Sequence, residues 1–133
     1  MSEQQAPQAG MFAWNELGTR NMDECKDFYT GLLGWEAVDM PMPTGMYTVF
    51  QKDGVNVGGM WKMGEEMGNI PSHWLSYIAV EDVDAATAKA EQLGAKIQMP
   101  PTDIPQIGRF SVVMDPGGAV FSLITFLPME GEG

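Results

Sequence analysis

The chain repeats part of its own sequence at a spacing of about 60 residues, and this limits the folds it can adopt. Residues 21–23 (Asn-Met-Asp) match residues 82–84 (Asp-Val-Asp) at a spacing of 61. Residues 45–50 match residues 108–113 at a spacing of 63. A slow drift in spacing is typical of two copies that differ by small loop insertions, and such self-similarity indicates a repeated supersecondary unit. The sequence therefore predicts two related modules.

The first copy is predicted to form a strand, a helix and three further strands. Alternating residues predict a strand over Phe12 to Thr19. Asn21 is expected to cap a helix whose apolar residues recur at helical spacing, and Gly34 is expected to end it. The later strands are predicted at 35–40, which Pro41 and Pro43 should end, and at 46–51 and 55–63.

The second copy repeats the same order. A strand is predicted over 74–80, followed by a helix that begins at the N-cap residue Asp82. The buried face of this helix is expected to hold Val83, Ala86, Ala90 and Leu93. Strands are then predicted at 96–99, which Pro100 and Pro101 should break, and at 110–114 and 119–126.

These patterns predict an α+β fold of two tandem βαβββ modules that form a pseudo-twofold curved sheet around a central cleft. The modules are expected at residues 10–66 and 73–127, with a linker at 67–72. Residues 1–9 and 128–133 are expected to be disordered tails. A pocket between two such halves is a common location for a small-molecule site.

Composition removes several classes of function. The net charge of -11 argues against nucleic acid or a membrane surface as a partner, because phosphate groups and anionic lipids would be repelled. No apolar run reaches the roughly 18 residues of a membrane span, and no signal peptide is expected. The single cysteine, Cys25, points to a reducing compartment, so we expect the cytoplasm. The single histidine, His73, excludes sites that need several imidazoles from one chain.

Three motifs, taken in order, resemble the vicinal oxygen chelate superfamily of glyoxalases, bleomycin-resistance proteins and extradiol dioxygenases. The first is Asp27-Phe28-Tyr29 followed by Leu33-Gly34-Trp35, and the second is the segment 73–84. The third is the segment 104–110, which runs into Asp115-Pro116-Gly117-Gly118-Ala119. The resemblance covers residues 10–127 and is greatest to an uncharacterised glyoxalase-like subgroup. It implies the paired-module fold and favours a homodimer.

The resemblance also implies four metal-ligand positions, one on the first and one on the last strand of each module. In this sequence they fall on Trp14, Leu75, Gly58 and Ser122. Tryptophan, leucine and glycine side chains do not coordinate divalent metals, and serine is a weak neutral ligand. We therefore expect no cofactor and no metal of the glyoxalase type.

Strand alternation predicts which side chains line the cleft. The expected ligand-binding residues are Trp14, Gly58, Met60, Leu75 and Ser122. The two residues expected to carry chemistry are Glu16 and Tyr77. An inward carboxylate needs a partner or a perturbed pKa, and it suits either a general base or recognition of an amine. Tyr77 is expected to hydrogen-bond a ligand or Glu16. Arg109 is expected either to meet an anionic group or to form a surface ion pair.

Three functions remain open from the sequence. The leading one is a metal-free protein that binds a small organic molecule in its cleft. The second is a drug-sequestering protein of the bleomycin-resistance type, which the net charge of -11 and the tryptophans would suit. The third is a lyase or isomerase in which Glu16 removes a proton next to a carbonyl. Whether the protein is an enzyme stays open at this point.

Overall fold

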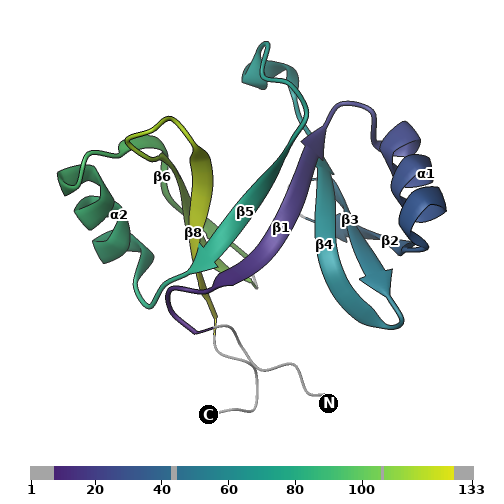
Figure 1. The fold of residues 1–133 in the computed structure, drawn as a ribbon, viewed down its shortest axis with the longest axis horizontal. Helices are drawn as coiled ribbons and strands as arrows, with labels where there is room; N and C mark the ends of the chain where they lie inside the picture. The colour runs from purple at the N-terminus through teal and green to yellow at the C-terminus, as the bar shows by residue number, and fades with distance from the viewer. Residues whose placement is uncertain (1–7, 43–44, 106, 128–133) are drawn as a thin grey trace. The chain divides into compact units, whose positions relative to one another are not determined.

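A computed structural model describes residues 8–42, 45–105 and 107–127. Residues 1–7 of the tail expected at 1–9, and all of the tail expected at 128–133, lie outside the described residues. The chain forms the two predicted βαβββ modules (Figure 1). The elements of the first module are β1 (Phe12–Thr19), α1 (Met22–Leu33), β2 (Glu36–Met42), β3 (Gly45–Lys52) and β4 (Val55–Lys62). Those of the second are β5 (His73–Ala79), α2 (Val83–Gln92), β6 (Lys96–Ile104), β7 (Gly108–Met114) and β8 (Val120–Phe126). A 3-10 turn, η1 (Glu65–Met67), follows β4.

The chain divides into two compact units that follow the repeat with small shifts at the boundaries. One unit is Trp14–Leu75, and the other joins the start of β1 to the segment from Ser76 onward. The predicted cleft between the modules stays a prediction.

In the first module the strands run in the order β2, β3, β4, β1, and one side of this sheet carries α1. The core on that side contains Leu17, Phe50 and Met60, of which Phe50 and Met60 are fully buried. Cys25 and Tyr29 of α1 pack against this core and are themselves only partly buried. No residue of α1 is fully buried, so most of the burial in this module belongs to the sheet.

The β3–β4 hairpin turns through two residues of unusual backbone conformation. Asp53 has φ 53° and Gly54 has φ 84°. A two-residue loop with both φ angles positive is the hairpin turn that matches the twist of its strands, and Asp-Gly is a favoured sequence for it. This turn joins the two strands predicted at 46–51 and 55–63.

In the second module the strands run in the order β5, β8, β7, β6. Val83 and Thr87 are the buried residues of α2, and the Thr87 hydroxyl lies 2.8 Å from that of Ser111 on β7. Leu93 was predicted on the buried face, but it is 69% exposed because it lies at the C-cap, after the last helical turn. The predicted N-cap Asp82 is confirmed, since its carboxylate accepts a hydrogen bond from Ala85 N at 3.1 Å.

The strand ends predicted at Pro41 and at Pro100-Pro101 are wrong, whereas Pro43, the other residue expected to end a strand, lies outside the described residues. Pro41 lies inside β2, and Pro100 and Pro101 lie inside β6. β2 and β6 are the outer strands of their modules, and proline is tolerated in an outer strand because its missing N–H faces away from the ladder. In β6 the pairing with β7 is also irregular between Ile97 and Thr102, which accommodates the two prolines.

Candidate functional site

The candidate site lies on the face of the first module's sheet that points away from α1. The pairing registers place two rows of residues across this face. The first row is Glu16, Gly59, Val49 and Val38, and the second is Gly18, Trp61, Tyr47 and Met40. Val38 is 41% and Met40 is 43% exposed, so the face presents apolar surface around a few polar groups.

A chain of hydrogen bonds joins three side chains on this face. Trp14 Nε1 donates to Tyr47 Oη at 2.9 Å, and Tyr47 Oη donates to Glu16 Oε2 at 2.8 Å. All three residues are half-buried. Both hydrogen bonds run in the same direction, from Trp14 to Tyr47 and from Tyr47 to Glu16, so the carboxylate accepts the second of them.

The phenol of Tyr47 keeps its proton in this environment. Burial raises the pKa of Tyr47 well above its ordinary value, and the nearby charge of Glu16 raises the pKa further. The hydrogen bond from Trp14 acts in the opposite direction, but it is the smaller effect. Tyr47 is therefore a hydrogen-bond donor at neutral pH.

Gly59 makes room for Tyr47. A Cβ atom built on Gly59 would collide with Tyr47 Oη and Cζ, and it would lie only 2.8 Å from Cε2. The absence of a side chain at residue 59 allows the phenol ring to lie over the strand beside Glu16.

The structure corrects the predicted positions on β4. Glu16 pairs with Gly59, just as its repeat equivalent Tyr77 pairs with Ser122. The last-strand position equivalent to Ser122 is therefore Gly59 and not Gly58. Gly58 and Met60 were predicted to share a face with Glu16, and this is wrong. Met60 lies in the core beneath α1, and Gly58 lies on that same side of β4.

The remaining predicted residues are distributed over both modules. Leu75 on β5 is buried, and so is Tyr77, whose ring lies 6.2 Å from that of Phe110. Ser122 is fully buried, and its hydroxyl donates to the Ser111 carbonyl at 2.7 Å. Glu16 and Trp14 are brought together in the first module. Any approach of Tyr77 or Ser122 to that pair stays a prediction.

Tyr47 was not predicted from the sequence, although the repeat contained a signal for it. Residue 47 matches Phe110 at the spacing of 63, so one copy carries a hydroxyl where the other carries a plain ring. The matching pairs are thus Glu16 with Tyr47 in the first module and Tyr77 with Phe110 in the second.

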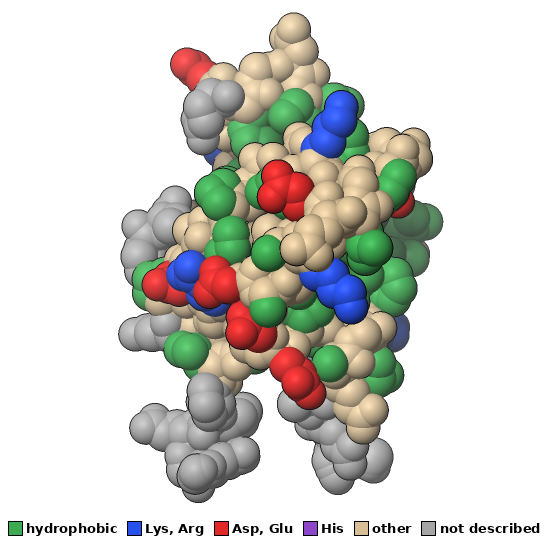
Figure 2. All heavy atoms as spheres, turned by 90° about the vertical axis from the view of Figure 1, so that its left-hand side faces the viewer, with side chains coloured by type: hydrophobic (Ala, Val, Ile, Leu, Met, Phe, Trp, Pro, Cys, Tyr) green, Lys and Arg blue, Asp and Glu red, His purple; other side chains and the backbone are tan. Residues whose placement is uncertain are grey.

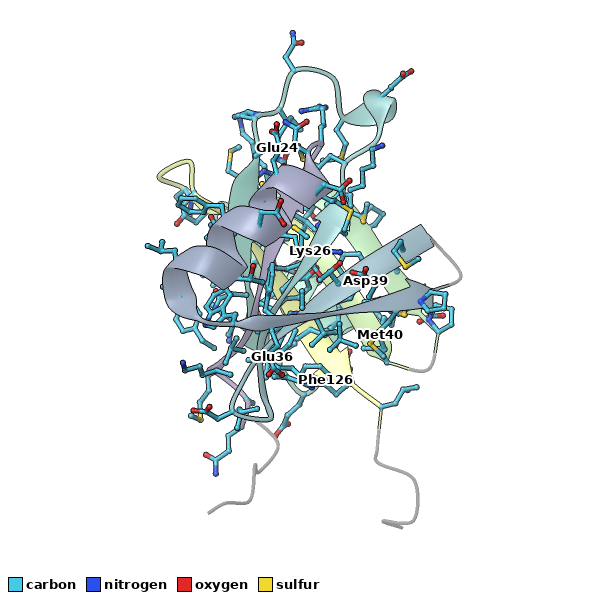
Figure 3. The ribbon with its side chains drawn as sticks, turned by 90° about the vertical axis from the view of Figure 1, so that its right-hand side faces the viewer. Glu24, Lys26, Glu36, Asp39, Met40 and Phe126 are labelled. Carbon is cyan, nitrogen blue, oxygen red and sulfur yellow. The ribbon has the colours of Figure 1, made fainter. Side chains whose placement is uncertain are left out.

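One ion pair of the first module lies outside the candidate site. Figure 3 shows Lys26 of α1 beside Asp39 of β2, and Lys26 Nζ lies 2.8 Å from Asp39 Oδ2. Asp39 also accepts a hydrogen bond from Thr48 at 2.7 Å. This pair lies on the helix side of the sheet and is not part of the candidate site.

Two shallow depressions lie away from the candidate site. One of about 360 Å³ surrounds Arg109, and another of about 440 Å³ surrounds Arg20 and Lys62. Arg109 forms exposed ion pairs with Asp84 at 3.1 Å and Asp103 at 2.8 Å, which confirms the surface-pair interpretation. Figure 2 shows acidic and basic side chains interspersed over the second module's surface.

Among the described residues, no group of three or more His, Cys, Asp or Glu side chains is placed to hold a metal ion. The described helices also include none that is long and apolar enough to span a membrane.

The order of elements and the strand pairing define a protein of two βαβββ modules with a glyoxalase-like fold. Residues 11–123 match the model of the Glyoxalase/Bleomycin resistance protein/Dioxygenase superfamily, and the chain belongs to this family.

Curated relatives are about twice as long. The chain is 38% identical over 124 residues to CFP32 of Mycobacterium tuberculosis (strain CDC 1551 / Oshkosh), whose name assigns it provisionally to the glyoxylases. It is 35% identical over 135 residues to the anthracycline biosynthesis protein DnrV of Streptomyces peucetius. Each alignment covers 92% of this chain but 47% and 49% of those relatives, so the chain spans about half their length.

Solved structures share the fold at low sequence identity. Methylmalonyl-CoA epimerase from Mycobacterium tuberculosis matches with a TM-score of 0.65 and 12% identity, over 95% of this chain and 94% of that one. A Mn(II)-bound glyoxalase from Novosphingobium aromaticivorans matches with a TM-score of 0.59 and 20% identity, over 89% of this chain and 39% of that one. At such identities the likeness shows the fold alone.

The two first-module residues at the metal-ligand positions that the family resemblance implies do not suit a divalent metal. Trp14 and Gly59 occupy the first-module positions, and neither side chain offers a metal ligand. The space above Gly59, where a ligand side chain would begin, is filled by the Tyr47 ring.

Proposed function

We propose that this protein binds a small organic molecule on the sheet face that carries Trp14, Tyr47 and Glu16, without a divalent metal. The observation that supports this is the hydrogen-bond chain from Trp14 through Tyr47 to Glu16. The apolar residues Val38 and Met40 lie on the same face and are partly exposed. An apolar surface with a few oriented polar groups is the usual composition of a small-molecule site.

The donor-to-acceptor direction of these hydrogen bonds predicts which polar group of a ligand would bind. Glu16 accepts a hydrogen bond from Tyr47, and an ionised carboxylate only accepts hydrogen bonds. A ligand with an N–H or ammonium group would therefore be preferred over one with a second carboxylate. Trp14 is placed to contact the ligand's apolar or aromatic body. We expect Leu75, Tyr77 and Ser122 to contribute if the predicted cleft forms.

A matched pair of probes tests this proposal. Binding of 2-naphthylmethylamine and of 2-naphthalenemethanol would be measured by calorimetry and thermal shift, since the two share a ring and differ in charge. We expect the amine to bind more tightly, and we expect Glu16→Gln to remove that difference. Arg109→Gln serves as a control because Arg109 pairs with Asp84 and Asp103 on the second module's surface. Equal binding of the amine by the Glu16→Gln and native proteins would reject the proposed site.

The metal-free part of the proposal has its own test. Protein purified without a chelator would be analysed for manganese, zinc, nickel and iron. We expect less than stoichiometric amounts of each metal. A stoichiometric metal that disappears in Glu16→Ala would contradict the proposal.

A drug-sequestering role is the second candidate. The net charge of -11 would attract cationic compounds, and a relative at 35% identity is named for the biosynthesis of anthracyclines, which are polycyclic aromatic compounds. Bleomycin and daunorubicin are suitable probes. A protein that sequesters either drug should show a rise in Tm at ligand excess, and no rise would eliminate that drug as a ligand.

Proton abstraction by Glu16 is the third candidate, because the Tyr47 hydrogen bond holds the carboxylate in a fixed position. Exchange of the α-proton of methylmalonyl-CoA in D₂O would detect such a reaction by mass spectrometry. Full exchange by Glu16→Gln would remove this residue from the mechanism.

We also propose that the chain assembles as a homodimer, which its membership of the glyoxalase superfamily favours. Sedimentation velocity over a range of protein concentrations would test this. A monomer at all concentrations would contradict the proposal.

A further inference from the structure

Tyr47 and Gly59 lie on neighbouring strands of the first module, and each limits what the other position can hold. Val49 on β3 pairs with Gly59, and Tyr47 lies two residues before Val49 on the same face of the sheet. The phenol ring of Tyr47 covers Gly59, since a Cβ atom added at Gly59 would overlap Tyr47 Oη and Cζ. We infer that Tyr47 and any side chain at residue 59 exclude each other, so that Tyr47 keeps this position from carrying a metal ligand.

Residue 59 lies at a position where a side chain could act as a metal ligand. It is the first-module equivalent of Ser122, and it pairs directly with Glu16. Side chains of directly paired residues have Cβ atoms roughly 5 Å apart, so a carboxylate at 59 would stand beside Glu16. Two adjacent carboxylates attract a divalent cation. With Tyr47 in place, a second carboxylate at residue 59 beside Glu16 is excluded.

The whole ring of Tyr47, and not only its hydroxyl, excludes a side chain at residue 59. The Cβ of residue 59 would also come within 2.8 Å of Cε2, which phenylalanine retains. Tyr47→Phe should therefore leave the exclusion in place, whereas Tyr47→Ala should remove it. This contrast separates steric exclusion from loss of the hydrogen bonds to Trp14 and Glu16.

Urea unfolding of single and double variants provides the test. Gly59→Ala is expected to lower the folding equilibrium constant about 5- to 150-fold in the native protein and in Tyr47→Phe, because the strand and ring must shift. In Tyr47→Ala the same change should be neutral or raise the constant by a few fold, because alanine has fewer unfolded conformations than glycine. The sign of the effect thus depends on the ring at residue 47.

Gly58→Ala is the matched control. A Cβ at Gly58 would meet the Asn15 carbonyl at 3.1 Å and the Trp74 ring at 3.8 Å, and Tyr47 is not among these neighbours. Its effect should therefore be the same with and without Tyr47. An equal effect of Gly59→Ala in the native and Tyr47→Ala proteins would overturn the inference.

Mn(II) supplies a second readout that needs no organic ligand, so its result is independent of the proposed function. The double variant Gly59→Glu/Tyr47→Ala should gain a Mn(II)-dependent rise in Tm that Tyr47→Ala lacks. A similar Mn(II)-dependent rise in Gly59→Glu with Tyr47 intact would overturn the exclusion. The absence of a rise in the folded double variant would overturn the assignment of residue 59 as a ligand position.

Discussion

Tyr47 and Glu16 are joined by a 2.8 Å hydrogen bond in which the phenol donates and the carboxylate accepts. The bond connects β3 to β1, two strands that are separated in the sheet by β4. It spans the strand that carries Gly59, so its formation depends on the missing side chain there. The polarity of the candidate site is therefore set by contacts between strands that are distant in the sequence.

Alkaline titration should distinguish Tyr47 from an ordinary tyrosine. Its folded pKa lies above the unfolded value of 10.0, so its contribution to stability is present below pH 10 and is lost as the pH rises further. Tyr47→Phe should leave the tyrosinate absorbance at 295 nm near pH 10 unchanged until the protein unfolds. A loss of one phenolate from that transition would contradict this prediction.

Helix capping differs between the two modules. Asp82 caps α2 through its carboxylate, whereas Asn21, at the equivalent position before α1, makes no side-chain cap hydrogen bond. Asp82→Ala should therefore lower the free energy of unfolding by about 1 kcal/mol. Asn21→Ala is the matched control and should cost much less in the same urea titration.

The Lys26–Asp39 pair should make stability depend on pH. The hydrogen bond from Lys26, supported by that from Thr48, lowers the pKa of Asp39 below 3.8. The contribution of Asp39 is then present above about pH 4 and is lost as the pH falls through its lower folded pKa. The same hydrogen bond raises the pKa of Lys26 above 10.5, so the contribution of Lys26 is present below pH 10.5 and is lost at higher pH.

Asp39→Asn should consequently destabilise the protein at pH 7 by roughly 0.2–1 kcal/mol, a range typical of solvent-exposed pairs. The difference from the native protein should shrink at pH 3 and in 1 M salt. Urea midpoints at the two pH values provide the measurement. A difference that persists unchanged at pH 3 would show that the charge of Asp39 is not responsible.

Arg20 anchors the segment between β4 and β5. Its guanidinium donates to the carbonyl of Ile70 at 2.7 Å and to that of Gly68 at 2.6 Å. Arg20→Gln should remove both bonds and increase the rate of amide exchange and proteolysis within residues 64–72. Lys62→Gln, a neighbouring cation, is the control and should have a smaller effect on that segment.

Most of the fold could be predicted from the sequence because local patterns determine it. The bounds of β1 agree residue for residue, and Gly34 ends α1 in the left-handed conformation, as predicted. The errors arose where the effect of a residue depends on the position of its strand in the sheet. Proline breaks a central strand, but Pro41, Pro100 and Pro101 lie in outer strands, and a strand's place in the sheet is not visible in a local pattern.

The candidate site was predicted only in part. Trp14 and Glu16 share a face because they alternate along one strand, and local periodicity is sufficient to show this. Tyr47 and Gly59 belong to the site because of how their strands pair with their neighbours. A shift of one residue in that pairing moves a side chain to the opposite face of the sheet. That single shift placed Gly58 and Met60 on the wrong side in the sequence-based prediction.

The prolines in β2 and β6 have a consequence for how the protein behaves at high concentration. An outer strand normally offers unpaired N–H groups that another chain can use to extend the sheet. Pro41 interrupts that row in β2, and Pro100 and Pro101 interrupt it in β6. Both outer strands therefore resist fibril-like growth, which protects a chain with so much β structure from aggregation.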